Sequence, residues 1–341
     1  MATRRELLVG LGSACALPAA RAIARAGVLA APTGGAAAEP RVLTASDVHV
    51  SGYPTVEALR WMGTTLEAET GGELGLRVYH SGQLGRENDT IDLARFGALD
   101  ITRINFASLN NPFPATQILS LPYVVDSTQH LRRIVDGAVG RDILKSFETR
   151  GLIGLAIYDS GTRCFYNRLR PVREPHDLTG LKIRVPPSDI FVSLVRALGA
   201  NPTPLSYGEI FSALQTHLID GAENNWTTFF TSRHFEVANY WAQSAHSYSP
   251  EALLMSARRF GHLTGSQQER VKSVAARSVP YMRSLWDTVE SNSRTSVEKK
   301  GVRIAEVDHA AFRKAADPVL KAYLQKDTEL RGLYDRVRAL A

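Results

Sequence analysis

Cysteine is nearly absent from this chain of 341 residues, which contains only two. Cys15 lies in an N-terminal stretch with the pattern of a cleaved leader, so the mature chain keeps one thiol, Cys164, and forms no internal disulfide. A single thiol cannot build a cysteine-rich zinc site, and the nine histidines lack metal-ligand spacing. We therefore expect a fold that depends on its hydrophobic core and that uses no metal or other cofactor.

Signatures of common enzyme classes are also missing. The sequence has no Walker loop, no dinucleotide-binding glycine fingerprint, no H-E-x-x-H and no G-x-S-x-G. After residue 40 it has neither the run of about 20 apolar residues that a membrane span needs nor a basic run typical of nucleic-acid binders. These absences favour a soluble protein that is not an enzyme and binds no nucleic acid.

Residues 1–38 have the pattern of an export signal. Arg4 and Arg5 precede a stretch of small and apolar residues, and Ala36-Ala37-Ala38 provides a cleavage site. Paired arginines indicate the twin-arginine route and a periplasmic protein; the alternative is a disordered tail. This segment holds four arginines and one glutamate, so the net charge of +6 falls to +3 (36 basic and 33 acidic residues) for the remainder.

Predicted strands and helices alternate after residue 40, which favours an α/β fold with largely parallel strands. Strands are expected at 41–44, 76–79, 99–105, 152–158 and 181–185. A capping box at Ser206–Glu209 begins one helix, and a second at Ser266–Glu269 begins a helix that reaches about Lys300 and that Pro280 should bend. A helix of that length can run across two domains. No flexible linker separates them, so the domains are expected to exchange chain segments.

Two arginines lie near strand ends, where open α/β sheets bind ligands. Arg163 follows the strand 152–158 by a short turn, and Arg184 lies within the strand 181–185. A buried arginine needs an anionic partner, and a protein carboxylate is the commoner one for a single arginine. Two such arginines favour an anionic ligand, because the guanidinium fork binds a carboxylate through parallel hydrogen bonds.

Other polar residues near predicted strand ends and helix starts are weaker candidates. Amides at Asn105 and Asn224 can read hydroxyl groups, although turn capping is the commoner use of asparagine there. Arg103 shares a strand face with Asn105, whereas His49 and Glu87 precede helices and can equally be capping or exposed residues. Tyr207 opens a helix and can equally be a core residue.

Several motifs, in order, resemble the solute-binding proteins of TRAP transporters over nearly all of the mature chain. They are GTRCFYN (161–167), DLTGLKIRV (177–185), LGANPTP (198–204), EIFSALQT (209–216) and IDGAENN (219–225), with support from 81–85 and 121–123. The resemblance implies a two-domain periplasmic binding protein (Venus flytrap) fold with a long helix spanning both domains. We place domain 1 at 39–160 plus 249–288 and domain 2 at 161–248 plus 289–341.

The resemblance also implies the site. Arg184 matches the arginine that pairs with the ligand carboxylate, Arg163 the second arginine, Asn224 the cleft amide and Tyr207 the cleft aromatic residue. SDVH (46–49), GRE (85–87), TRIN (102–105) and ENNW (223–226) look like the branch that binds hexuronates such as D-glucuronate or D-galacturonate. There His49, Glu87, Arg103 and Asn105 would read hydroxyl groups, and His246 would line the cleft.

The implied partners are the integral membrane subunits of the transporter, with the binding protein itself a monomer. Three alternatives remain at this point. The protein can bind another carboxylate, such as a dicarboxylate or an aromatic acid. It can be an exported enzyme that acts on sugar acids, or a sensing module that delivers its closed form to a receptor.

Overall fold

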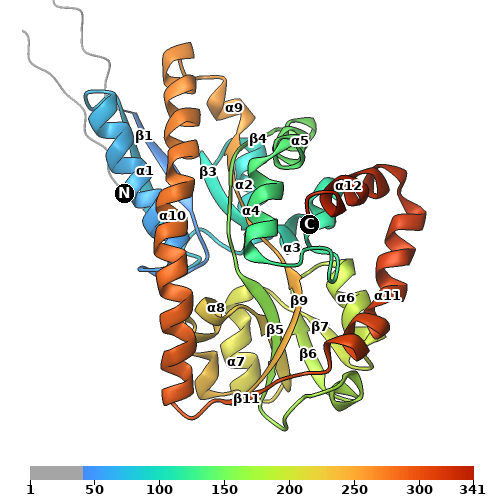
Figure 1. The fold of residues 1–341 in the computed structure, drawn as a ribbon. Helices are drawn as coiled ribbons and strands as arrows, with labels where there is room; N and C mark the ends of the chain where they lie inside the picture. The colour runs from blue at the N-terminus through green and yellow to red at the C-terminus, as the bar shows by residue number, and fades with distance from the viewer. Residues whose placement is uncertain (1–40) are drawn as a thin grey trace, which may run out of the picture. The chain divides into compact units, whose positions relative to one another are not determined.

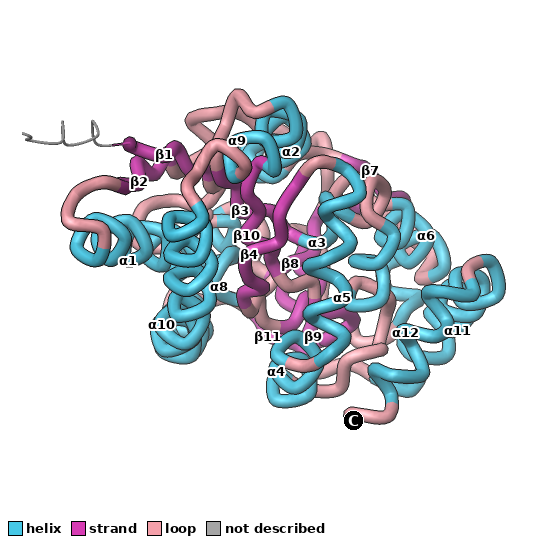
Figure 2. Tube along the Cα trace, turned by 90° about the horizontal axis from the view of Figure 1, so that it is seen from above, coloured by secondary structure: helices cyan, strands magenta, loops and turns pink. Residues whose placement is uncertain are grey.

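The computed structural model describes residues 41–341, and the predicted export signal at 1–38 lies outside them. Strands form two sheets, and helices pack on both sides of them (Figures 1 and 2). The five-stranded sheet runs in the order β2 (Leu74–Tyr79), β1 (Arg41–Ser46), β3 (Ile101–Asn105), β10 (Glu251–Ser256), β4 (Leu152–Tyr158). The six-stranded sheet runs β11 (Arg303–Ala305), β9 (Tyr240–Tyr248), β5 (Thr162–Asn167), β8 (Gly221–Asn224), β6 (Lys182–Val185), β7 (Asn201–Pro204).

The prediction of largely parallel strands is only partly right, because both sheets are mixed. Strands β1, β2 and β3 are parallel, but β10 enters antiparallel between β3 and β4. In the other sheet β5 is antiparallel to both β8 and β9. The chain passes from one sheet to the other three times: directly between β4 and β5 and between β9 and β10, and through α9 (Ala257–Phe260) and α10 (Gly265–Lys299) between β10 and β11. Each sheet is therefore built from chain segments that are not continuous in the sequence.

Helices cover both sheets. They are α1 (Pro54–Glu69), α2 (Glu87–Phe96), α3 (Phe106–Leu109), α4 (Thr128–Asp136), α5 (Ala138–Ser146), α6 (Asp189–Ala197), α7 (Ile210–Gln215), α8 (Trp226–Thr231), α9 (Ala257–Phe260), α10 (Gly265–Lys299), α11 (His309–Lys326) and α12 (Thr328–Arg338). Short 3₁₀ helices are η1 (Pro114–Leu119), η2 (Phe147–Arg150), η3 (Pro175–Leu178), η4 (Tyr207–Glu209) and η5 (His234–Glu236). Within residues 41–341 no helix has the length and apolar character to cross a membrane.

Helix α10 is the predicted long helix. It packs on α1 and β4 of the five-stranded half and on α8 of the six-stranded half, and Figure 1 shows it alongside both. Its capping box differs from the expected one, because Thr264 and Gln267 cap each other where Ser266 and Glu269 were predicted to do so. The Ser206–Glu209 box is present, but it begins η4 and α7, which ends at Gln215.

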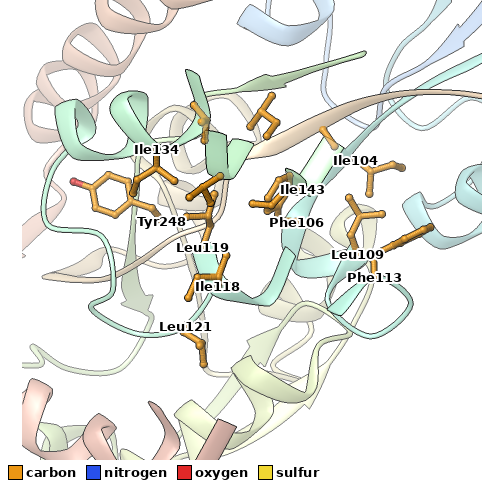
Figure 3. Packing of buried hydrophobic residues seen from close by; sticks show 14 of the residues in the cluster. Ile104, Phe106, Leu109, Phe113, Ile118, Leu119, Leu121, Ile134, Ile143 and Tyr248 are labelled. Carbon is orange, nitrogen blue, oxygen red and sulfur yellow. The ribbon is translucent and has the colours of Figure 1, made fainter. Parts of the chain in front are cut away.

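Alternation along the strands builds a separate core on each face of each sheet. In β10, Ala252 and Leu254 face a cluster with α4, α5 and η1, whereas Leu253 and Met255 face α1 and α10. Figure 3 shows the first of these clusters, in which Tyr248 at the end of β9 packs with residues of the five-stranded half. Helix α12 also packs there, through Leu330 and Val337.

The connection between β4 and β5 is tightly enclosed. Gly161 has φ +65°, and a Cβ there would overlap the carboxylate of Glu290 on α10 and lie 3.2 Å from Trp286. Asp159, two residues earlier, is buried and pairs with Arg132 of α4 at 2.6 Å and Arg283 of α10 at 3.0 Å. The crossover is thus fixed to α10 by both packing and charge.

Replacing Gly161 with alanine should therefore destabilise the protein more than the same change at an open turn. We expect Gly161→Ala to lower the free energy of unfolding by about 2–3 kcal/mol, from positive φ and overlap together. Gly180→Ala is the matched control, because Gly180 has φ +80° with no atom within 4 Å of its Cβ position. It should cost about 1 kcal/mol in urea unfolding. Equal losses would contradict the enclosed crossover.

Candidate functional site

Two adjoining cavities lie where residues of the two sheets meet. The inner cavity has a volume of about 30 Å³, and the outer one has about 420 Å³. They share Val48, Glu87, Ser108, Arg184 and Tyr207. Eight of the nine predicted site residues line the inner cavity: His49, Glu87, Arg103, Asn105, Arg163, Arg184, Tyr207 and Asn224. The structure thus brings together residues that are up to 175 positions apart in the sequence.

Arg184 is a buried cation that has no ion-pair partner in the part of the chain that the structure describes. It lies in β6 with 3% of its surface exposed, and its Nε donates to the carbonyl oxygen of Leu205 at 2.9 Å. Within residues 41–341 no carboxylate forms an ion pair with it. Burial and the charge of Arg163 lower the pKa of Arg184 to about 10, although the charges of Glu223 and Glu87 act in the opposite direction, so the guanidinium stays charged at neutral pH. Arg184 lines both cavities, and an anion entering either would meet it.

Arg163 lies nearby but already has a partner. It belongs to β5, a strand that the sequence did not predict, and forms a fork with Glu223 of β8, with Nε–Oε2 at 2.5 Å and Nη2–Oε1 at 2.7 Å. Burial alone would raise the pKa of Glu223, but Arg163 and His246 bring it below its ordinary value. The protein-carboxylate alternative therefore applies to Arg163, although the side chain also reaches the inner cavity.

His246 does not line either cavity, in contrast to the expectation that it would line the cleft. It is fully buried behind Glu223, with Nε2 3.4 Å from Oε2 of that residue and Nδ1 2.9 Å from the hydroxyl of Ser244. Its ring stacks on Phe165 with centroids 4.3 Å apart. Burial lowers the pKa of His246, which keeps it neutral at pH 7. Its contacts support the Arg163–Glu223 pair.

Arg103 is enclosed by three carboxylates. Its Nη2 donates to Asp47 at 2.5 Å and its Nη1 to Glu87 at 2.8 Å, while Nε lies 3.4 Å from Glu251 without hydrogen-bond geometry. Its side chain has no exposed surface. Burial alone would raise the pKa values of Asp47 and Glu251, but Arg103 holds both below their ordinary range. Two of its five N–H donors are thus hydrogen-bonded to carboxylates, and Nε–H has no acceptor within residues 41–341.

Glu87 is held in place by the groups around it. Its Oε1 accepts from Arg103 and from the backbone N–H of Asn105 at 2.9 Å, and its Oε2 accepts from Ser108 at 2.7 Å. It is the first residue of α2 and lines both cavities. Each carboxylate oxygen can accept a further hydrogen bond, so Glu87 can accept one from a hydroxyl group and keep its fixed position.

His49 and Tyr207 meet across the cavities. Nδ1 of His49 lies 3.1 Å from the Tyr207 hydroxyl, and Nε2 lies 3.4 Å from Glu251, so both ring nitrogens face protein groups. His49 also stacks on Tyr53 with centroids 3.6 Å apart. The Tyr207 hydroxyl contacts Ser232 as well, at 2.5 Å. Tyr207 can therefore offer a ligand its ring more readily than its hydroxyl.

The two asparagines differ in what they leave free. Asn105 caps α3 by accepting from Ala107 at 3.0 Å, and its amide also exchanges hydrogen bonds with Ser249. That is the capping role raised above as the commoner one. Asn224 accepts from the backbone of Asn225 at 2.9 Å, and its Nδ2 has no partner among the described residues. Asn224 thus retains a donor at the inner cavity.

Some residues of this site were not predicted as members. Glu223 and Glu251 are the counter-ions of Arg163 and Arg103, and Ser108 fixes Glu87. Glu223 is 60 residues from Arg163, and the strand register pairs it with Phe165, two residues from Arg163 along β5. No local pattern identifies such a partner. Within 41–341 no cluster of histidine, cysteine and carboxylate side chains could hold a metal ion.

Two mixed sheets that share two strand crossovers, a long helix and a polar cleft define the class of periplasmic solute-binding proteins. The model of the family described as bacterial extracellular solute-binding protein, family 7, matches residues 45–327, and the chain belongs to this family. It is a family of binding proteins and not of enzymes, so the enzyme alternative falls away.

Similar solved structures are TRAP periplasmic solute-binding proteins. One from Bradyrhizobium, in complex with α/β-D-galacturonate, is 46% identical, with TM-score 0.86 over 88% of this chain and 100% of that one. One from Xanthobacter autotrophicus, with β-D-galacturonate, is 43% identical, with TM-score 0.85 over 87% and 99%. A third, from Roseobacter denitrificans with β-D-glucuronate, is 36% identical, with TM-score 0.85 over 88% and 99%.

The Arg163–Glu223 pair should be important for stability. Glu223→Gln leaves a buried guanidinium without a counter-charge, and we expect the free energy of unfolding to fall by about 3 kcal/mol. Glu209→Gln is the matched control, because Glu209 pairs with Arg86 at 3.4 Å in an exposed position. Glutamine can keep its capping bond to Ser206, so this change should cost less than about 0.5 kcal/mol. Similar urea midpoints for the two variants would contradict a stabilising role of the Arg163–Glu223 pair.

Proposed function

We propose that this protein captures a hexuronate, D-galacturonate or D-glucuronate, for a TRAP transporter. The observation that carries the proposal is the charge of Arg184, which is buried at the cavities without an ion-pair partner among residues 41–341. A ligand carboxylate would supply the missing charge through the guanidinium fork. The galacturonate and glucuronate complexes of similar proteins support a uronate as the source of that carboxylate.

The roles of the other residues follow from what each leaves unpaired. Asn224 would donate its free Nδ2–H to the ligand, with Arg163 behind it as a second cation near the carboxylate. Glu87 would accept a sugar hydroxyl, and the Tyr207 ring would cover an apolar face of the sugar. Arg103, His49 and Asn105 would act by fixing Glu87 and Tyr207, and His246 by fixing Glu223.

Binding would be accompanied by closure of two domains, with boundaries at 39–160 plus 249–288 and 161–248 plus 289–341. The crossovers at 159–161 and 249–250 would serve as hinges, and His49–Tyr207 and Tyr53–Thr228 (3.1 Å) would join the domains in the closed form. Closure would exclude water and strengthen the carboxylate contact. The closed monomer would then deliver its ligand to the integral membrane subunits, after export of the chain through a twin-arginine signal at 1–38.

A thermal-shift screen of organic acids on the purified protein tests the proposal. D-galacturonate or D-glucuronate at 100 times its dissociation constant should add about 2.7 kcal/mol of stability. D-galactose and D-glucose, which lack the carboxylate, serve as controls and should produce no shift. If only a different carboxylate stabilises the protein, that acid is its ligand in place of a uronate. If no carboxylate stabilises it, the proposed function is wrong.

Arg184→Met separates a ligand contact from a structural ion pair. Methionine retains most of the aliphatic length but no charge, so uronate affinity should fall by about 100-fold, or roughly 3 kcal/mol. The ligand-free protein should lose no stability, because an unpaired buried charge is removed. Calorimetric titration and urea unfolding give the two quantities.

Arg163→Met is the matched control for this substitution. It leaves Glu223 buried without its partner, so the ligand-free protein should lose about 3–5 kcal/mol of stability. If Arg184→Met binds uronate like the unmodified protein, or loses as much stability as Arg163→Met, Arg184 is not the carboxylate contact.

A further inference from the structure

One wall of the outer cavity contains a polar residue that the proposed function does not use. His234, the first residue of η5, has 2% of its surface exposed and lines this cavity together with Arg184, Tyr207 and Ser232. The preceding residue, Arg233, has φ +58°, an uncommon backbone conformation for a residue other than glycine. Arg233 is held there by a fork to Glu236, with both contacts at 2.8 Å. The turn that carries His234 is thus fixed.

The imidazole of His234 is neutral. Burial is the largest cause and the charge of Arg184 the second, and together they lower its pKa to about 3. A neutral imidazole carries one N–H and one unprotonated nitrogen, and its hydrogen bonds decide which nitrogen holds the proton.

Tyr166 decides the tautomer of His234. Its hydroxyl oxygen lies 2.8 Å from Nδ1 of His234, which is the only hydrogen-bond partner of that hydroxyl among the described residues, and its side chain is fully buried. If Nδ1 carried the proton, its N–H would donate a hydrogen bond to the Tyr166 hydroxyl oxygen. The O–H of Tyr166 would then be buried without an acceptor, at a cost of about 1–3 kcal/mol. Tyr166 therefore donates to Nδ1, and the ring proton lies on Nε2.

Nε2 of His234 has no hydrogen-bond partner within residues 41–341, although the side chain is almost completely buried. Because Nδ1 contacts Tyr166 and the residue lines the outer cavity, the Nε2–H is left free to donate on that wall. Arg184 lies on the same wall and has its own unpaired charge. A ligand bound by Arg184 would thus lie near a second donor, the neutral Nε2–H of His234.

We infer that His234 is a further ligand-binding residue, which donates its Nε2–H to an uncharged acceptor oxygen of the sugar acid whose carboxylate Arg184 binds, and that Tyr166 positions this donor. The inference rests on the proposed function. A hexuronate in its ring form has such an oxygen next to the carboxylate: the ring oxygen is bonded to the carbon that bears the carboxylate, and it accepts without donating. Arg184 and His234 together select carboxylates with an oxygen at the adjacent carbon. They disfavour those with an ammonium group there, which would face two donors.

The tautomer is measured first, on the ligand-free protein. Long-range ¹H–¹⁵N correlation spectra of histidine-labelled protein should show the Nε2–H form for the resonance that disappears in His234→Gln. Tyr166→Phe should convert this resonance to a mixture of tautomers, because nothing then fixes the proton. An Nδ1–H tautomer in the unmodified protein would overturn the inference, whatever the protein binds.

Affinity for D-galacturonate is measured next, by calorimetry. His234→Phe should weaken binding by about tenfold, the value of one lost hydrogen bond. His234→Gln should recover part of that loss, because its amide nitrogen reaches close to the position of Nε2. Tyr166→Phe should weaken binding by about threefold. His309→Phe, an exposed change at the start of α11, should have no effect.

The outcomes distinguish this inference from the proposed function. Unmodified protein that binds neither uronate overturns the proposed function and, with it, the ligand assigned to His234. Uronate binding that is equal in the unmodified protein and in His234→Phe overturns only the inference about His234. Melting temperatures of each variant show whether it folds, and the tautomer measurement on unmodified protein stands without any variant that binds.

Discussion

The burial of Arg184 without a counter-ion is the constraint around which the rest of the site is arranged. Removing a charge from water is costly unless an opposite charge accompanies it. Arg103 meets this condition with Asp47, Glu87 and Glu251, and Arg163 meets it with Glu223. Each of those carboxylates is committed to its own arginine, and Arg184 instead donates through Nε to a carbonyl oxygen. Among the described residues Arg184 thus lacks a carboxylate partner, and a ligand carboxylate would neutralise its charge most directly.

The mixed topology is what assembles these groups. Strand β10 lies antiparallel to β3, which places Glu251 at the beginning of β10 opposite Asn105 at the end of β3. In the other sheet, β5 begins at the edge where β8 ends, so Arg163 and Asn224 lie at the same edge as Arg184 near the end of β6. A parallel arrangement of these strands would send the same side chains to opposite edges. The two crossovers between the sheets then bring both edges to one cleft.

The sequence predicted several secondary-structure elements, but it did not predict which residues contact one another across the fold. Five of the strands, the Ser206 box and the long helix follow from short-range patterns, and the gathering of eight candidate residues follows from the motifs that resemble the family. The antiparallel insertion of β10 was not predicted, because the pairing joins segments about 150 residues apart and no local pattern encodes it. For the same reason Asn105 and His49 were expected to face a ligand, whereas long-range contacts with Ser249, Tyr207 and Glu251 engage their polar atoms. Strand register decides which carboxylate meets a buried arginine, and the register is apparent only in the folded structure.

The same reasoning separates residues that hold the site from residues that are free to act on a ligand. A polar atom already in a short hydrogen bond within the protein gains little from a ligand, because binding would exchange one bond for another. A polar atom that reaches a cavity and has no partner within the described residues exchanges only a contact with water for the bond to a ligand. Arg184, Nδ2 of Asn224 and Nε2 of His234 belong to the second kind, and all three lie at the two cavities. His234 was not among the candidates, because its free nitrogen depends on the hydroxyl of Tyr166, 68 residues away. The unsatisfied donors, more than the number of charged side chains, therefore define which oxygens of a sugar acid this cleft can recognise.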